Sequence, residues 1–215
     1  MPSVQDTHRI ERALKRIQEL RAWRHAAESP LPDWTFSAGE ETTPIQIGDD
    51  WPVVDTPVRM AGSGTVPADW AGQPVELEIW LGGEGLLTIE HGGESLQVGL
   101  DPFHHNFVLP GAAAGGETIS ISAELVPKGM FGSHVEEPRF ERAHLVIPNG
   151  PVRALDRDLT NIIEACEYLG DHDVVALLLD VVEASLRALS PAWPTATDVT
   201  VTRLVRGYVD PIGSG

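Results

Sequence analysis

Residues 75–81 read Val-Glu-Leu-Glu-Ile-Trp-Leu, with an apolar side chain at every odd position. Successive side chains of a β-strand point to opposite faces, so this run predicts a strand with one buried and one solvent-facing side. The same alternation recurs in Ile119, Ile121, Ala123 and Leu125. These two runs favour an antiparallel sheet with one buried face and one solvent-exposed face.

Similar short runs, separated by Gly, Pro, Asp and Asn, extend from about residue 33 to residue 149. Gly92-Gly93 lies between two of them and predicts a tight hairpin. About eight short strands at this spacing are typical of a two-sheet sandwich or jelly roll. We expect strands at residues 45–47, 58–66, 75–81, 85–91, 95–100, 106–109, 118–126 and 142–147.

Helical periodicity flanks this β region on both sides. Apolar residues recur at steps of three and four over residues 4–27, which predicts an amphipathic helix that Pro30 and Pro32 end. The period returns after Pro151 in two segments separated at Gly170, a suitable C-terminal cap. The short loop between these segments predicts an antiparallel helical hairpin.

The sequence therefore predicts an α+β chain that is mainly β. We expect an antiparallel β-sandwich or jelly roll flanked by an N-terminal helix and a C-terminal helical hairpin. The predicted divisions are the amphipathic helix (1–32), the sandwich (33–149), the hairpin (150–190), and a linker with a strand (191–215).

Composition excludes several classes of function. The 215 residues carry a net charge of −17, whereas nucleic-acid binders concentrate Lys and Arg, so we expect no nucleic-acid partner. No run of about 18 apolar residues exists, so we expect no membrane association. The single Cys166 excludes a disulfide framework, and no secretory signal is visible, which makes a cytoplasmic location the expectation.

The charge is uneven along the chain. Residues 1–27 hold six basic and three acidic side chains, so a basic helix leads an acidic body. Such a helix can dock on that body or on an acidic neighbour; the alternative is a solvated face without a partner.

Candidate catalytic residues are sparse. Adjacent His104 and His105 point to opposite faces of a strand and cannot both bind one ion. The acidic residues around His172 suit helix capping, and Cys166 falls on an apolar helical stripe where a thiol usually packs. A histidine-centred metal enzyme remains an alternative, but no self-sufficient active site is visible and no cofactor is expected in this chain.

Aromatic and histidine side chains suggest sugar binding. A tryptophan ring can stack against the C–H face of a sugar, although tryptophan is also common in β cores. The candidate sugar-binding residues are Trp51, Trp80, His91 and His104.

Six strings carry a resemblance to the N-terminal region of bacterial glycoside hydrolase family 38 α-mannosidases. They are Arg9–Arg12, Leu20–Arg24, Asp50–Val54, Val66–Trp70, Leu81–Leu87 and Gly99–His104. In that family an N-terminal helix, a β-sandwich and a helical linker precede a zinc-dependent catalytic domain. The resemblance runs from about residue 9 to about residue 205 and covers only the family's non-catalytic portion.

The C-terminal residues depart from the family's zinc-binding motif. In the family a β-branched strand leads to a His-x-His-x-Asp-Pro-like motif whose second His and Asp bind zinc. Here Asp210 matches the zinc-ligand Asp, but Arg206 and Tyr208 replace the histidines. A guanidinium or a phenol does not substitute for imidazole as a zinc ligand, so we expect no formed zinc site at Asp210. The resemblance implies that the catalytic domain lies outside this sequence.

The resemblance implies a non-catalytic N-terminal module of an α-mannosidase-like glycoside hydrolase, inactive on its own. We expect it to associate with a catalytic glycosidase domain or with another copy of itself, and to contact mannose-containing sugars. The alternative is an independent carbohydrate-binding β-sandwich.

Overall fold

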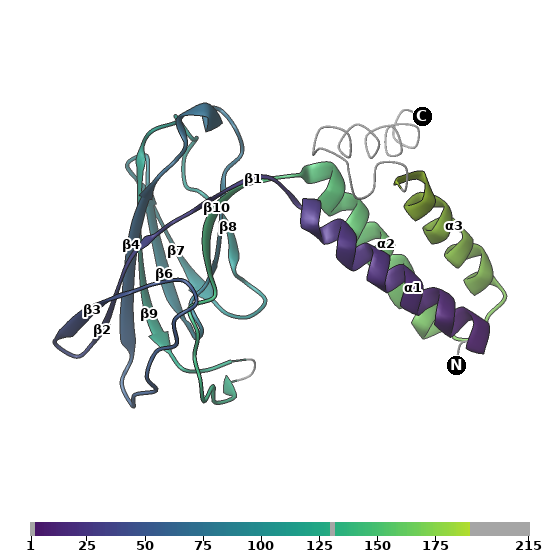
Figure 1. Ribbon diagram of the computed structural model, residues 1–215, viewed down its shortest axis with the longest axis horizontal. Helices are drawn as coiled ribbons and strands as arrows, with labels where there is room; N and C mark the ends of the chain where they lie inside the picture. Colours follow the sequence, from purple (N-terminus) through teal and green to yellow (C-terminus); the bar gives the residue numbers. More distant parts are fainter. Residues whose placement is uncertain (1–2, 130–131, 190–215) are drawn as a thin grey trace. The chain divides into compact units, whose positions relative to one another are not determined.

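The computed structural model describes residues 3–129 and 132–189, which form two compact units. A sandwich unit comprises Ala27–Ile147, and a helical unit combines the N-terminal residues up to Ala26 with those from Pro148 onward. Residues 190–215, which include the predicted final strand and Asp210, lie outside the described residues. Figure 1 shows the helices and strands in chain order.

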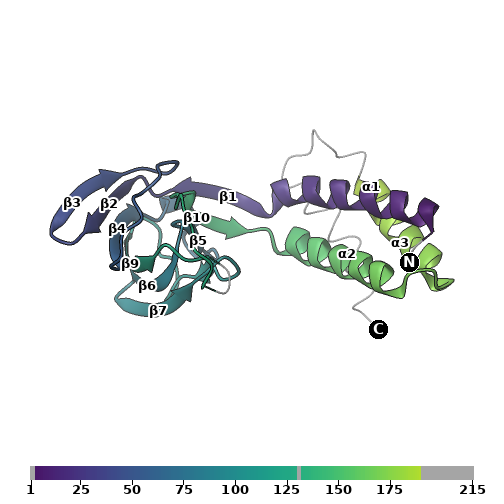
Figure 2. The same ribbon diagram turned by 90° about the horizontal axis from the view of Figure 1, so that it is seen from below.

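The sandwich is built from two antiparallel sheets (Figure 2). A four-stranded sheet has the order β1-β10-β5-β8, and a six-stranded sheet has the order β3-β2-β4-β9-β6-β7. The strands are β1 (His25–Pro30), β2 (Asp33–Ala38), β3 (Glu41–Ile45), β4 (Val58–Thr65), β5 (Glu76–Trp80), β6 (Glu84–His91), β7 (Glu94–Leu100), β8 (Asn106–Val108), β9 (Thr118–Val126) and β10 (Arg142–Pro148). Two short 3-10 helices lie at Arg21–Trp23 and Ala68–Trp70. This architecture confirms the predicted α+β fold.

Alternation of side chains places the core between the two sheets. In β9, Ile119, Ile121 and Leu125 are buried while Ser120 and Ser122 face solvent. Burying such apolar side chains is the main stabilising contribution to a sandwich of this kind. The outer face of β9 therefore carries the polar side chains of Ser120, Ser122 and Glu124.

The predicted hairpin at Gly92-Gly93 is confirmed. His91 pairs with Glu94, and both glycines have positive φ angles of 60° and 83°. A two-residue turn with positive φ at both positions matches the right-handed twist of the flanking strands, and glycine adopts it without steric cost.

Among the described residues, the helical unit contains three α-helices: α1 (Val4–Leu20), α2 (Gly150–Leu169) and α3 (Val174–Leu189). All three contribute to one apolar core, which includes Ile17, Leu159 and Val182. Gly170, with φ 65°, caps α2 as predicted. None of the described helices combines the length and apolar character that a membrane span requires.

The predicted extent of the first helix is wrong. The helix ends at Leu20 rather than near Ala27, and the chain enters strand β1 at His25. The segment His25–Pro30 has no strong preference of its own, so pairing with β10 decides its conformation. Strand β2, which the sequence prediction missed, follows directly at Asp33–Ala38.

Candidate functional site

The structure places the four predicted sugar-binding residues in different environments. Trp51 is buried in the sandwich core, where its Nε1 donates to the Leu81 carbonyl oxygen at 2.7 Å. Its ring lies against Phe36, with centroids 5.9 Å apart. An indole that is 3% exposed and whose only donor bonds to the backbone mainly stabilises the core.

His91 is likewise buried. Its Nδ1 lies 2.7 Å from the Pro110 carbonyl oxygen, and its Nε2 lies 2.8 Å from Oε1 of Glu117. The same carboxylate oxygen of Glu117 accepts a bond from the Ala114 backbone N–H at 2.9 Å. His91 therefore ties the end of β6 to the loop before β9.

His104 is exposed and organises a turn. Its Nδ1 lies 2.8 Å from Oδ2 of Asp101, and its backbone N–H donates to Oδ1 of the same residue at 2.9 Å. The hydrogen bond from His104, followed by that from the Phe103 backbone N–H, lowers the pKa of Asp101 below its ordinary value. Asp101 and His104 thus form a self-contained turn.

Trp80 lines a hollow of about 350 Å³ on the four-stranded sheet. Arg142 lies opposite Trp80 in the strand register, and His105 and Pro102 complete one wall. Arg142 bonds to Glu28 at 2.7 Å and also to Glu78, so carboxylates within the sheet already use much of its donor capacity. Trp51 lines another hollow, of about 570 Å³, and His91 lines one of about 300 Å³, although both residues are buried.

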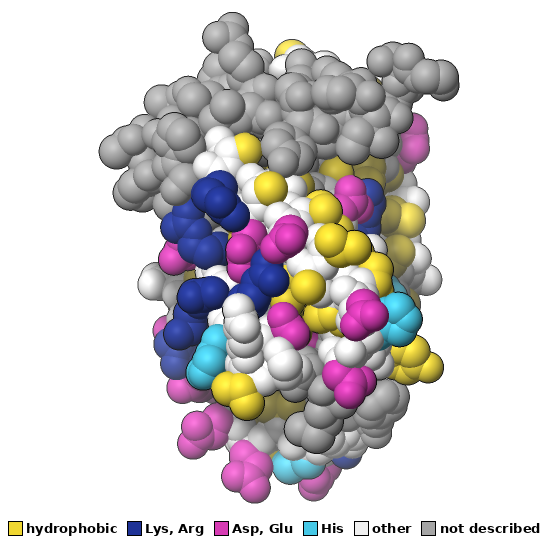
Figure 3. All heavy atoms as spheres, turned by 90° about the vertical axis from the view of Figure 1, so that its right-hand side faces the viewer, with side chains coloured by type: hydrophobic (Ala, Val, Ile, Leu, Met, Phe, Trp, Pro, Cys, Tyr) yellow, Lys and Arg dark blue, Asp and Glu magenta, His cyan; other side chains and the backbone are white. Residues whose placement is uncertain are grey.

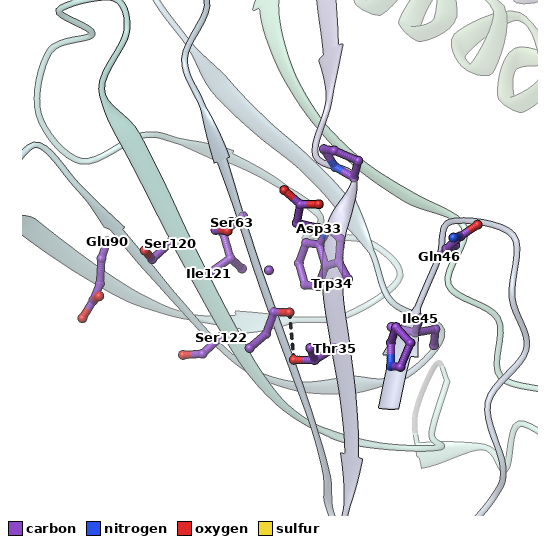
Figure 4. A pocket seen from close by; sticks show the side chains of 14 residues that line it. Asp33, Trp34, Thr35, Ile45, Gln46, Ser63, Glu90, Ser120, Ile121 and Ser122 are labelled. Carbon is purple, nitrogen blue, oxygen red and sulfur yellow. Dashed lines mark hydrogen bonds between the residues drawn. The ribbon is translucent and has the colours of Figure 1, made fainter. Parts of the chain in front are cut away.

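A larger hollow, of about 720 Å³, lies on the outer face of the six-stranded sheet (Figure 4). This volume is in the range of small-molecule sites. Its polar lining comes from β2, β4, β9 and β6 and from the turn after β3: Asp33, Thr35, Gln46, Ser63, Glu90, Ser120 and Ser122. The sequence analysis missed these residues, although each one on a strand occupies an outward position of an alternating pattern.

Strand register aligns four of these side chains in a row. Asp33 lies opposite Ser63, Ser63 opposite Ser120, and Ser120 opposite Glu90. Figure 4 shows the four side chains in this order across the sheet. Two carboxylates are therefore separated by two hydroxyls along a line perpendicular to the strands.

The floor of this hollow depends on a glycine. Gly62 is the cross-strand neighbour of Trp34, and a Cβ at residue 62 would overlap the Trp34 indole. Trp34 itself is buried and donates from Nε1 to the Leu31 carbonyl oxygen at 2.8 Å. The indole thus lies beneath the backbone of β4, while the outward neighbours of Gly62 are the small Ala61 and Ser63.

The helical unit is held together by ion pairs as well as by its core. Arg9 on α1, 13% exposed, bonds to Asp180 at 2.6 Å and Glu183 at 2.8 Å, both on α3. The hydrogen bond from Arg9 is the largest contribution that lowers the pKa of Glu183. Arg21 pairs in the same way with Asp156 on α2 at 3.0 Å. The basic leading helix therefore contacts acidic residues of its own unit.

The outward face of α3 is apolar. Leu177 and Val181, one turn apart, are 65% and 53% exposed. Ala184 and Ala188 continue the same stripe. Figure 3 shows apolar side chains on the surface of this unit beside a group of Lys and Arg side chains. We call Leu177, Val181, Ala184 and Ala188 the α3 stripe.

The described residues do not fit the zinc that the resembling family uses. Within residues 3–129 and 132–189, no group of three or more His, Cys, Asp and Glu side chains is placed to hold a metal ion. The zinc-ligand position of the family, Asp210, lies outside this part of the chain.

Solved structures with weak similarity to this chain include two that share the same domains. Both contain the CBM51-2 and INT domains from Clostridium perfringens ZmpB. The complex with GlcNAc is 8% identical with a TM-score of 0.26, covering 84% of this chain and 39% of that one. The second structure is 7% identical with a TM-score of 0.25, covering 86% and 42%. The chain thus spans less than half of these proteins, and the similarities carry no inference about ligands.

Comparison with curated proteins gives no match. A family model does match: residues 16–149 correspond to the family described as "Alpha-mannosidase, jelly roll domain". The match covers more than half of the chain and spans the whole sandwich unit. The observed two-sheet sandwich is the fold that this description requires. The chain therefore belongs to the α-mannosidase jelly roll domain family.

Proposed function

We propose that this chain is a non-catalytic module of an α-mannosidase-type glycoside hydrolase, and that it associates with the catalytic domain of that enzyme. The observation that carries this proposal is the α3 stripe, an exposed apolar face in a chain whose family is defined in α-mannosidases. On its own, we expect the chain not to hydrolyse glycosides.

Helix α3 is apolar on two opposite sides. Its inner side, with Val175, Leu179 and Val182, packs into the core of the helical unit. The α3 stripe lies outside that core, although a helix that is apolar around most of its circumference is usually buried. Contiguous exposed apolar surface marks interaction sites, so a second covering element is expected over α3.

The composition of the stripe suits a close-packed protein interface. Leu177 and Val181 supply branched apolar side chains, and Ala184 and Ala188 let a partner backbone approach the helix. Asp180 and Glu183 border the stripe with charges that Arg9 already partly neutralises. A hydrophobic centre with a charged margin is the usual anatomy of such interfaces.

The test is to produce this chain and the α-mannosidase catalytic domain of the same genome separately and to measure complex formation by sedimentation velocity. We expect a complex that Leu177→Glu weakens at least about tenfold, since a buried unpaired charge is costly. The matched control is Val108→Glu, which changes a comparably exposed residue of the sandwich and should leave the complex intact.

Two outcomes contradict the proposed association with the catalytic domain. One is the absence of a complex with the wild-type chain. The other is concentration-dependent dimerisation of this chain alone that Leu177→Glu abolishes, which assigns the α3 stripe to a second copy. Hydrolysis of an aryl α-mannoside by this chain alone would contradict the non-catalytic role.

We further propose that the sandwich unit contacts mannose-containing sugar. The polar hollow on the six-stranded sheet supports this role, because its exposed hydroxyl and carboxylate groups match the hydroxyls of a carbohydrate. An independent carbohydrate-binding module is the alternative function, and sugar binding without association with a catalytic domain would favour it.

A further inference from the structure

The polar hollow continues across the six-stranded sheet. A second hollow of about 300 Å³ adjoins it and shares two lining residues, Glu90 and Ser120. The shared row extends to Ser95 on β7, which lies opposite Glu90. We call the row Asp33, Ser63, Ser120, Glu90 and Ser95 the polar groove.

We propose that the polar groove binds an uncharged oligosaccharide that lies across the strands, with the carboxylates of Asp33 and Glu90 accepting hydrogen bonds from sugar hydroxyls. This inference rests on the sugar-contact role proposed above and identifies its site, its direction and its ligand class. It does not use Trp51, and His91, which borders the second hollow, is buried with both ring nitrogens bonded to Pro110 and Glu117.

The length of the polar groove selects an oligosaccharide over a single sugar. Neighbouring strands lie roughly 4.8 Å apart, so the three spacings from Asp33 to Glu90 extend for about 14 Å. One further spacing reaches Ser95. A single hexose cannot contact both carboxylates, whereas a short chain of sugars can contact both and the serines between them.

The polar groups of the groove are available to a ligand. In the part of the chain that the structure describes, no side-chain hydrogen bond engages Asp33, Ser63, Ser120 or Glu90. Asp33, Ser120 and Glu90 are exposed, and Ser63 is half-buried. Hydroxyls both donate and accept, and an ionised carboxylate accepts from two donors at once, so the row complements a ligand rich in hydroxyl groups.

The charge, spacing and composition of the lining residues argue against other classes of ligand. The described residues that line the two hollows include Asp33, Glu90 and Glu94 but no Lys or Arg, which disfavours an anionic ligand. Asp33 and Glu90 are three strands apart and cannot share one cation. Protein interfaces are enriched in aromatic residues and depleted in Ser, whereas serines dominate this row.

The test is a titration of the ¹⁵N-labelled chain with α-linked mannotriose, followed in ¹H–¹⁵N spectra. We expect shifts in β2, β4, β9 and β6, with weaker binding of methyl α-mannoside and no binding of trigalacturonate, an anionic chain of the same length. Glu90→Gln and Ser120→Tyr should each lower the affinity for mannotriose by a factor of about ten or more. Glu90→Gln removes a charged acceptor, and Ser120→Tyr fills the hollow with a larger side chain.

The matched control is Glu124→Gln, which makes the same chemical change on the same sheet face outside the polar groove and should leave the affinity unchanged. The spectrum of each variant reports directly whether it is folded.

The inference is overturned if mannotriose causes no shifts, if Glu90→Gln binds as the wild type does, or if Trp80→Ala abolishes binding that Glu90→Gln leaves intact. Because the titration uses this chain alone, its result is independent of association with a catalytic domain, so the two proposals fail separately.

Discussion

The side chain of His91 is completely buried, with its Nε2 2.8 Å from Oε1 of Glu117. Its other nitrogen, Nδ1, lies 2.7 Å from the carbonyl oxygen of Pro110. A carbonyl oxygen accepts hydrogen bonds, so Nδ1 donates to Pro110 while Nε2 pairs with the Glu117 carboxyl group. The histidine that sequence analysis assigned to sugar contact thus forms a partly buried hydrogen-bonded pair that fixes a loop.

Replacing His91 should destabilise the sandwich. His91→Gln removes the imidazole that bonds to Glu117 and leaves this partly buried carboxyl group poorly paired, which we expect to cost about 2 kcal/mol in the free energy of unfolding. Urea denaturation measures this change. The control is His104→Gln, an exposed histidine whose loss should change stability by less than about 0.5 kcal/mol. Equal effects of the two substitutions would contradict a structural role for His91.

The same pair predicts sensitivity to acid. Burial alone would raise the pKa of Glu117, but hydrogen bonds from His91 and from the Glu117 and Ala114 backbone N–H groups outweigh it and lower this pKa below its ordinary value. A lowered pKa in the folded state gives stability that is complete above the unfolded value, about 4.3, and is lost as the pH falls through the folded value. Thermal unfolding between pH 3 and pH 7 should show a smaller acid-induced loss of stability in Glu117→Gln than in the wild type.

The two ion pairs of Arg9 differ in solvent exposure, which predicts that they contribute unequally to the stability of the helical unit. Glu183, whose pKa Arg9 lowers by hydrogen bonding, is 30% exposed, whereas Asp180 is 68% exposed. Solvent screens the more exposed pair, so Glu183→Gln should reduce the unfolding free energy by about 1 kcal/mol and Asp180→Asn by less than half of that. Chemical denaturation of the two variants provides the comparison. A larger loss for Asp180→Asn would contradict the expected order of the two pairs.

Cys166 should be unreactive in the folded chain. It is free and buried on α2, and burial, the largest contribution, raises the pKa of its thiol. Because the thiolate is the reactive form, a disulfide reagent should label the native chain slowly and the urea-unfolded chain quickly. The rate of labelling in increasing urea should follow the unfolding of the helical unit. Rapid labelling without denaturant would show that the core around Cys166 opens readily.

The close approach of Gly62 to the Trp34 indole predicts that a larger residue at position 62 destabilises the sandwich. Gly62→Ala places a methyl group onto the Trp34 indole and should destabilise the sandwich by about 1–3 kcal/mol. Gly99→Ala is the matched control, because a Cβ at residue 99 has no neighbouring atom within 4 Å. Equal stability of the two variants would mean that the indole moves away without cost.

Local pattern predicted the sandwich well where the alternation was strict. Strand β9 was predicted with its observed bounds, Thr118–Val126, and the glycine hairpin formed as expected. The segment His25–Pro30 was missed because its own sequence favours neither state, and pairing with β10 decides it. Asp33–Ala38 does alternate, with Trp34 and Phe36 buried, so this strand could have been found.

The site residues were harder to predict because they depend on register. The polar groove joins Asp33, Ser63, Ser120 and Glu90 from four strands that are far apart in the sequence, and no local spacing connects them. Residue type alone favoured Trp51, whose indole the fold buries. Only the pairing of strands determines which hydroxyls form one row.

We propose that the catalytic domain of an α-mannosidase covers the α3 stripe. Hydrogen exchange on this chain, alone and mixed with the separately produced catalytic domain, provides the test. We expect added protection of backbone amides in Val174–Leu189 on mixing, and no added protection when the mixture contains the Leu177→Glu variant. Unchanged exchange in α3, or protection confined to the outer face of the six-stranded sheet, would contradict it.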